Sequence, residues 1–244
     1  LATTHLHLSR ALAKLEKFAD ARRELQSAVK LEPDLAAAHL ELGQLLARAN
    51  EHEAAVSHLE QATRLAPDAA DAYVELAKVR LARGETHEAL LAFKQRLRAR
   101  PNDADAHFGL AETFIFAKRD AEAVEAQEAG LKLDPKRKRG FRTLGEVFVR
   151  LGRHDDAIGP LDKAVIEEPN DAALWSLLAS CHERLEHTEK AIEALTKAVA
   201  QSKEDASLHK RLGLAHRKAL HDAEAIASLT SAITLDPKLL DLEA

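Results

Sequence analysis

The sequence contains no methionine, one cysteine (Cys181), one tryptophan and one tyrosine. A single cysteine excludes an intramolecular disulfide framework and a zinc site built from several cysteines. Nine glycines and seven prolines among 244 residues indicate that the loops are short. No apolar run approaches the roughly 18 residues of a membrane-spanning helix, and residues 1–30 contain no apolar core of a signal peptide. The missing signal favours a cytoplasmic location, and the missing initiator methionine leads us to expect a piece of a longer protein.

An excess of positive charge is also lacking. Lys and Arg number 35 against 40 Asp and Glu, which gives a net charge of −5. This balance excludes a strongly basic nucleic-acid-binding protein. An apolar content of 46% excludes a disordered chain. Alanine makes up about one residue in five and β-branched residues are few, which favours helices.

The prolines reveal an internal period. They recur every 34 residues at Pro33, Pro67, Pro101, Pro135 and Pro169, and after one slot held by Lys203 the grid continues at Pro237. With proline at position 32, the chain divides into seven repeats: 2–35, 36–69, 70–103, 104–137, 138–171, 172–205 and 206–239. Every repeat has leucine at position 7, alanine at position 20, a ring-bearing residue at position 4 and a small residue at position 8. Such agreement at a fixed period predicts a repeat architecture.

Each repeat predicts two helices. The apolar positions fall on two helical stripes, separated by a break near positions 14–17 that Gly84 and Gly152 mark in two repeats. Proline at position 32 ends the second helix, and the small residues at positions 8 and 20 allow the two helices to approach closely. Pro160 lies off the grid inside a second helix, where we expect a kink.

These columns resemble the tetratricopeptide repeat family, and the resemblance covers residues 2–239. The departures from the family pattern are Arg96, Gln127, Gly130 and Lys203. The resemblance implies an all-α fold: a right-handed α-solenoid superhelix of seven 34-residue helix-turn-helix repeats, with the first helix of each repeat lining a concave groove. We expect one array over residues 1–244, in which residues 240–244 begin a truncated cap and Leu239, Leu240 and Leu242 supply its apolar side chains.

Catalytic motifs are absent from the sequence. Gly140 and Gly145 have the spacing of a phosphate-binding loop, but glutamate follows where lysine is required. His182 and His187 are similar to a zinc-protease pair, yet they are five residues apart instead of four, so we expect their rings to diverge. Cys181 is interpreted as a buried small residue. We therefore predict no enzymatic activity, no cofactor and no metal site.

The resemblance places positions 2, 5, 6, 9, 12 and 13 in the groove, and helical geometry puts them on one stripe opposite the packing stripe. In repeats five to seven these positions carry a basic set: Arg139, Arg142, Arg150, Arg184, Lys210, Arg211, Arg217 and Lys218. A concave surface of one charge sign attracts anions. In repeats one to four, acidic residues outnumber basic ones such as Arg10, Lys14 and Arg48.

Apolar groove positions gather in the first four repeats. The candidates for partner binding are Leu40, Val74, Phe108, Ile115 and Phe116. Exposed apolar residues that lie together mark interaction sites. The alternative for the two phenylalanines is that they pack beneath neighbouring helices.

We predict a scaffold whose groove binds a partly acidic, partly apolar protein segment. Family members that clamp the C-terminal carboxylates of chaperones use basic residues where this chain has Asp71 and Glu75, so that ligand does not transfer. Two alternatives stay open. The chain is the repeat arm of a larger enzyme, such as a glycosyltransferase or sulfotransferase, or it self-associates as a homo-oligomer through an uncapped end. Neither nucleic-acid binding nor membrane insertion is expected, since stacking aromatics are scarce on the basic face.

Overall fold

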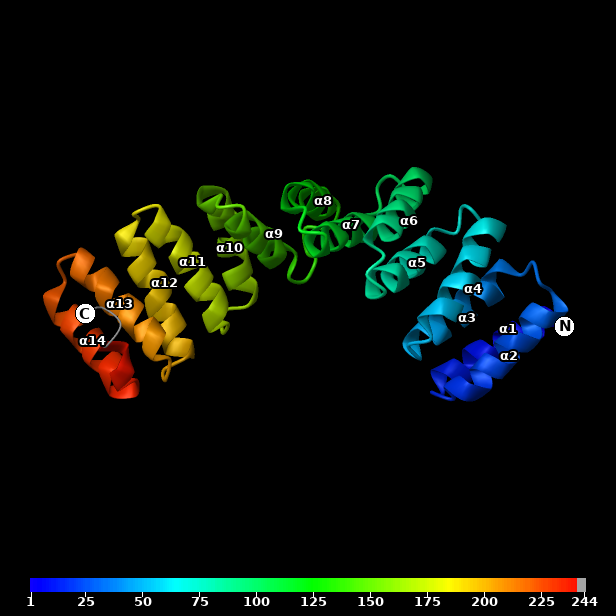
Figure 1. Ribbon diagram of the computed structural model, residues 1–244, viewed down its shortest axis with the longest axis horizontal. Coiled ribbons are helices and arrows are strands. Elements are labelled where there is room, and N and C mark those ends of the chain that lie inside the picture. Colours follow the sequence, from blue (N-terminus) through cyan, green and yellow to red (C-terminus); the bar gives the residue numbers. More distant parts are fainter. Residues whose placement is uncertain (241–244) are drawn as a thin grey trace. The chain divides into compact units, whose positions relative to one another are not determined.

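The computed structural model describes residues 1–240, except for the side chains of residues 70, 239 and 240. The chain divides into two compact units, Leu1–Asp134 (the N-terminal unit) and Pro135–Ala244 (the C-terminal unit). The N-terminal unit contains α1 (Ala2–Lys14), α2 (Phe18–Leu31), α3 (Ala36–Arg48), α4 (His52–Leu65), α5 (Ala70–Ala82), α6 (Thr86–Ala99), α7 (Ala104–Phe116) and α8 (Asp120–Leu133) (Figure 1). The C-terminal unit contains α9 (Gly140–Arg150), α10 (His154–Glu167), α11 (Ala172–Arg184), α12 (Thr188–Gln201), α13 (Ala206–Lys218), α14 (Asp222–Leu235) and the 3-10 helix η1 (Pro237–Leu240).

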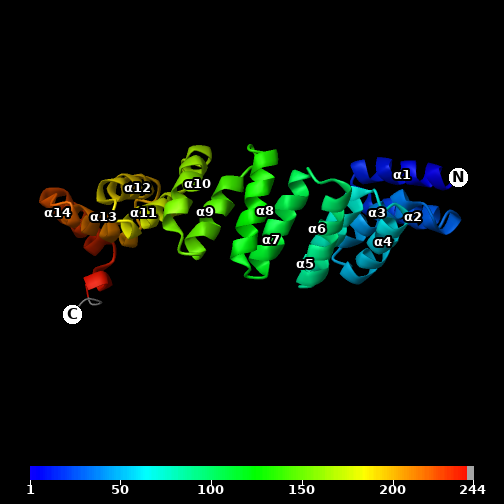
Figure 2. The same cartoon turned by 90° about the horizontal axis from the view of Figure 1, so that it is seen from above.

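The helices pack in chain order. In each repeat the two helices form an antiparallel pair, and within each unit the second helix of one repeat packs on the first helix of the next. Within each unit the helices follow one another side by side in the second view (Figure 2). Residues 1–240 contain no β-strand. The prediction of an all-α solenoid built from seven helix pairs is confirmed, whereas a single array over 1–244 stays a prediction.

The helix bounds follow the 34-residue register. First helices span positions 1–13 and second helices span positions 17–30, with one exception. The exception is α9, which begins two residues late at Gly140 because Arg139 adopts a left-handed backbone conformation with φ 60°. The basic run Lys136–Arg139 therefore lies in the turn before α9.

A left-handed residue at position 15 ends every first helix. Positive φ occurs there in all seven repeats, at Glu16, Asn50, Gly84, Lys118, Gly152, Glu186 and Leu220. The amide of position 16 donates to the carbonyl of position 11, as His187 does to His182 at 2.9 Å. This is the Schellman arrangement, which satisfies carbonyls that the helix end leaves without partners. The sequence indicated this turn only at Gly84 and Gly152, because in the other five repeats a residue with a side chain adopts the left-handed conformation.

Small residues set the distance between paired helices. The alanine at position 20 is buried in every repeat. At position 8, a Cβ added to Gly43 would lie 2.6 Å from Leu59 Cγ, and one added to Gly213 would lie 2.6 Å from Leu229 Cγ. Distances below about 3 Å are not seen between real side chains, so these helices approach as closely as glycine allows. The close approach predicted from positions 8 and 20 is confirmed.

The ring at position 4 joins successive repeats. Trp175 donates its indole Nε1–H to the carbonyl of Pro169 at 2.8 Å. The Nε2 atoms of His39 and His209 lie 2.9 Å from the carbonyls of Pro33 and Lys203. His39, Trp175 and His209 thus anchor the turn between repeats through a hydrogen bond to the carbonyl at position 32, a role that adds to the packing expected from sequence.

The two ends of the repeat series expose apolar side chains. Leu8 at position 7 is 46% exposed, whereas each later leucine of that column is buried. Ile226 in α14 is 67% exposed. Of the apolar residues expected to begin a cap, Leu239 and Leu240 belong to η1 and Leu242 lies outside the described residues. No helix within residues 1–240 combines the length and apolarity required to cross a membrane.

Candidate functional site

A pocket opens on the first-helix face of the C-terminal unit. Its volume is about 210 Å³, and its lining residues are Glu183, Thr188, Ala191, Arg211, Leu214, Ala215 and Lys218. They come from α11, α12 and α13, and they include position 12 of one repeat and positions 6, 9, 10 and 13 of the next. Apolar contacts are supplied by Ala191, Leu214 and Ala215, and charge is supplied by Glu183, Arg211 and Lys218. A small apolar cavity with a few fixed polar groups is the usual form of a binding site.

Arg211 is held in place by α11. Its Nη1 donates to Ser176 Oγ at 2.6 Å, and its Nη2 donates to Ser180 Oγ at 2.9 Å and to Glu183 Oε2 at 2.8 Å. These bonds join the first helices of two successive repeats. Arg211 lines the pocket, and Glu183 neutralises its charge.

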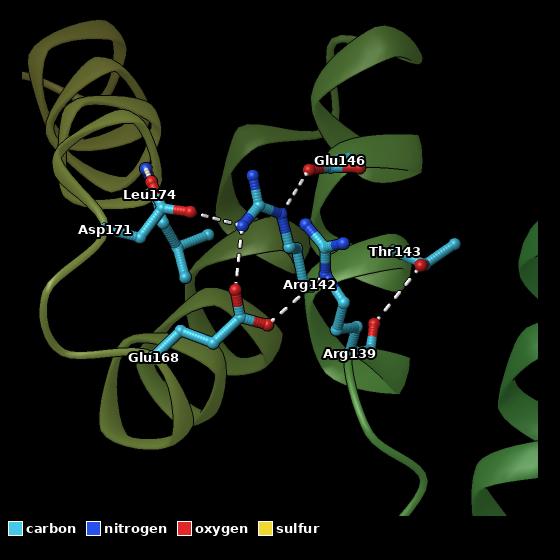
Figure 3. A network of polar contacts seen from close by, with 7 residues as sticks. All are labelled: Arg139, Arg142, Thr143, Glu146, Glu168, Asp171 and Leu174. Carbon is cyan, nitrogen blue, oxygen red and sulfur yellow. Dashed lines mark hydrogen bonds and ion pairs between the residues drawn. The ribbon is translucent and has the colours of Figure 1, made fainter.

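Arg142 is the centre of a second network, which Figure 3 shows. Its Nε donates to Glu146 Oε1 at 2.8 Å, and its Nη1 donates to Glu168 Oε2 at 2.9 Å and to Asp171 Oδ2 at 2.5 Å. Asp171 also caps α11, since its Oδ1 accepts the amide of Leu174 at 3.0 Å. Only 16% of the Arg142 side chain is exposed, so this residue joins α9 to the start of α11 and has little surface to offer a ligand.

The network shifts the pKa of both partners. The hydrogen bonds that Arg142 donates to Glu146 and then to Asp171 raise its pKa above the ordinary value, and they outweigh desolvation. The hydrogen bond from Arg142 lowers the pKa of Asp171. Both groups therefore stay charged over the physiological pH range.

The remaining basic candidates lie nearer the surface. Arg139 is 58% exposed and its Nε lies 3.4 Å from Glu168 Oε1. Lys218 is exposed, with its Nζ 3.9 Å from Glu186 Oε1, and Lys210 is half-buried. Arg150, Arg184 and Arg217 are exposed. Of these cations, Lys218 lines the pocket, and Arg184 and Arg217 are exposed at the C-terminal ends of α11 and α13.

The apolar candidates of the N-terminal unit fall into two groups. Phe116 at the end of α7 is 59% exposed, and Ile115 and Leu40 are half-buried. Val74 is buried. The ring of Phe108 packs on α8, where a Cβ added to Gly130 would lie 2.7 Å from Phe108 Cε1. The alternative of packing beneath a helix is thus observed for Phe108, while Phe116 remains open to solvent.

Sequence reasoning overlooked several partners of these side chains. Glu168 and Asp171 stand at positions 31 and 34 of repeat five. They therefore lie outside the groove positions, and the net charge of those positions does not include them. Ser176 and Ser180 carry no charge and were not counted either. An arginine at position 5 together with acids at positions 31 and 34 of the same repeat is the signal in the sequence that indicates the network around Arg142.

The expectation that His182 and His187 diverge is wrong. Their ring centroids lie 5.7 Å apart, because the helix ends at Arg184 and the left-handed residue Glu186 turns the chain back. The same turn brings His216 and His221 to 5.7 Å in the next repeat. Among residues 1–240, no group of three or more His, Cys, Asp or Glu side chains is placed to hold a metal ion.

Cys181 is fully buried, and desolvation raises the pKa of its thiol to about 11. A thiol with so high a pKa is protonated at neutral pH, so it is a poor nucleophile. The interpretation as a buried small residue is confirmed.

Comparison with known proteins agrees with the repeat pattern. The family model described as "Tetratricopeptide repeat" matches residues 6–70, 48–92, 74–138, 142–202 and 182–239. No curated protein matches the sequence.

Three solved structures illustrate the similarity of fold. YrrB, a TPR protein with an unusual peptide-binding site, is 20% identical with a TM-score of 0.66, covering 75% of this chain and 94% of its own. A tetratricopeptide repeat protein from Parabacteroides merdae is 17% identical with a TM-score of 0.66, covering 96% and 93%. MamA from Desulfovibrio magneticus RS-1, from residue 41 to its end, is 25% identical with a TM-score of 0.58, covering 72% and 97%.

Proposed function

Because the chain belongs to the tetratricopeptide repeat family, whose arrays are protein-interaction scaffolds, we propose that its first-helix face binds a partly acidic, partly apolar protein segment. In the C-terminal unit this face binds acidic side chains, and in the N-terminal unit α7 binds apolar side chains. The peptide-binding site named for YrrB, a protein of the same fold, supports a peptide as the ligand.

The observation that carries this proposal is the pocket between α11 and α13. Arg211 is fixed there by Ser176, Ser180 and Glu183, so binding costs little side-chain entropy at this residue. Lys218 lines the pocket, and Arg184 and Arg217 are exposed at the C-terminal ends of the same two helices, where they supply positive charge. Charges at the edge of an interface steer an oppositely charged partner and act mainly on the association rate.

Phe116 supports the apolar part of the proposal. A phenylalanine that is 59% exposed at a groove position, with Ile115 beside it, offers contact area without rearrangement of the core. Burial of such a surface is worth roughly 25 cal/mol per Å². This contribution is independent of salt, in contrast to the charges of the C-terminal unit.

The proposal is tested with a fluorescein-labelled peptide, acetylated and amidated, in which glutamate and leucine alternate. Its counterpart carries glutamine in place of every glutamate. Fluorescence anisotropy at low salt measures binding of both peptides to the full chain. We expect the acidic peptide to bind more tightly and R184E/R217E to weaken it by about tenfold, with a smaller effect at high salt.

The matched control is K190E/K197E, which makes the same change of charge at exposed positions of the second helix α12. Arg142 is unsuitable for this test, because its reversal would break the network around Asp171. Equal binding of the acidic and the glutamine peptide, or equal loss in the control, would refute the proposal.

A further inference from the structure

We propose that the N-terminal unit contains a second anion-binding subsite, between α1 and α3, for a peptide carboxylate that lies beside an aliphatic side chain. This inference rests on the proposed function and assigns a ligand chemistry to repeats one and two. The sequence predicted no anion site there, because acidic residues outnumber basic ones over the first four repeats taken together.

The subsite is a pocket of about 350 Å³. Its lining residues are Ser9, Arg10, Ala13, Lys14, Leu25, Glu41, Gln44, Leu45 and Arg48. They come from α1, α2 and α3, so two successive repeats build it. Acidic residues such as Asp71 and Asp105 outweigh the basic residues when the groove positions of repeats one to four are summed. These two acids belong to α5 and α7 and do not line the pocket.

The pocket carries a positive charge that the protein does not neutralise. Arg10 Nε donates to Glu41 Oε1 at 2.6 Å, which pairs the one acid of the lining with one of its three cations. Lys14 and Arg48 make no hydrogen bond or ion pair with any described residue. The amide of Gln44 adds a neutral donor group. Two cations and one amide therefore face a pocket that holds no other acid.

The same repeat positions form the pocket of the C-terminal unit. Position 12 of one repeat and positions 6, 9, 10 and 13 of the next are Ala13, Glu41, Gln44, Leu45 and Arg48 in one pocket and Glu183, Arg211, Leu214, Ala215 and Lys218 in the other. In both pockets an ion pair crosses the two repeats and fixes position 6, with the signs reversed: Arg10 with Glu41, and Glu183 with Arg211. Two independent occurrences indicate that the helix packing itself creates this cavity.

The lining selects the ligand chemistry. Arg48 presents a planar fork that matches a carboxylate, and Lys14 adds a compact charge. Ala13, Leu25 and Leu45 offer an aliphatic surface in the same cavity. A side-chain carboxylate next to leucine, or a C-terminal carboxylate on an aliphatic residue, satisfies both requirements.

The test uses the full chain and three labelled peptides. The first is the amidated glutamate–leucine peptide, which has only side-chain carboxylates. The second is the glutamine–leucine peptide with a free C-terminal carboxylate, and the third is its amidated form without any carboxylate. Anisotropy is measured for the wild type, for K14Q/R48Q and for the matched control K30Q/R64Q, which removes the same charge from exposed positions of α2 and α4.

We expect K14Q/R48Q to weaken one of the two carboxylate-bearing peptides by about tenfold, and the control to leave both unchanged. The peptide that responds identifies the source of the carboxylate. Both substituted residues are exposed, so the thermal unfolding curve should match the wild type.

The failure of this subsite is distinguishable from the failure of the proposed function. If R184E/R217E weakens the acidic peptide while K14Q/R48Q has no more effect than K30Q/R64Q, the subsite is refuted and the proposed function stands. If all three peptides bind the wild type equally, both proposals are refuted.

Discussion

Arg96 and Asp103 form an ion pair inside the N-terminal unit, with 2.6 Å between Nη2 and Oδ2 and less than one tenth of either side chain exposed. Arg96 replaces the alanine that the repeat pattern has at position 27. Asp103 uses its other oxygen to cap α7, where Oδ1 accepts the amide of Ala106 at 3.0 Å. Arg96 Nη1 also lies 3.2 Å from Asp71 Oδ1. The departure from the family pattern is therefore compensated by a polar network that joins repeats three and four.

Removal of Arg96 should leave a buried carboxylate without its partner. Arg96→Ala is expected to lower the free energy of unfolding by about 3–5 kcal/mol, although alanine suits the repeat pattern. Urea denaturation followed by circular dichroism measures the change. Arg98→Ala at a neighbouring exposed position of α6 is the control. An Arg96→Ala variant as stable as the wild type would show that the pair contributes nothing.

Leu220 adopts φ 63° at the left-handed position of the last repeat and is 83% exposed. A left-handed conformation costs a residue with a Cβ about 1–2 kcal/mol, and glycine avoids this cost. Leu220→Gly should therefore raise the free energy of unfolding by about 1 kcal/mol, seen as a higher melting temperature. Gly152→Ala at the equivalent position of repeat five should lower it by a similar amount. A destabilised Leu220→Gly variant would mean that the Leu220 side chain makes a contact that matters more than the strain.

His39 and His58 share a hydrogen bond between their Nδ1 atoms at 3.0 Å. Because His39 Nε2 lies 2.9 Å from the Pro33 carbonyl and donates to it, His39 accepts at Nδ1 when neutral, and His58 donates. Burial, and then the neighbouring His39, lower the pKa of His58 below its ordinary value of 6.5.

The unfolded chain therefore binds a proton at His58 more tightly than the folded chain does. The contribution of His58 to the free energy of unfolding is therefore fully present above a pH of about 6.5. It decreases as the pH falls through that value toward the lower pKa of His58 in the folded chain. Urea titrations at several pH values between about 7 and 5 should show this loss, and His58→Leu should reduce it. His87→Leu at an exposed position of α6 serves as control. A wild-type pH dependence that His58→Leu leaves intact contradicts this assignment.

Phe108 and Phe116 lie on the same helix but should respond differently to truncation. Phe108→Ala opens space against Gly130 and is expected to cost about 2 kcal/mol, less than a fully buried phenylalanine. Phe116→Ala should leave stability within about 0.5 kcal/mol and weaken binding of the leucine-containing peptides without changing the salt dependence. Thermal unfolding and anisotropy measure the two effects. Loss of stability in Phe116→Ala, with no loss of binding, would remove Phe116 from the interaction surface.

The sequence by itself determined the repeat frame. Proline at position 32, alanine at position 20 and the small residues at position 8 act within one repeat, so a fixed period of 34 was enough to predict fourteen helices and their close packing. The ends of the second helices that precede a proline also follow locally, because the residue before proline disfavours the helical conformation.

Only the tertiary structure decided which side chains are engaged. Arg142 and Arg184 look alike on the groove stripe, yet one is bound by acids from positions 31 and 34 and the other is exposed. The rings of His182 and His187 lie in contact because Glu186 adopts a left-handed conformation, which the sequence does not indicate since Glu186 is not glycine. Charge pairing and ring contacts depend on distances between helices and repeats. A one-dimensional pattern fixes the order of the residues along each helix but not those distances.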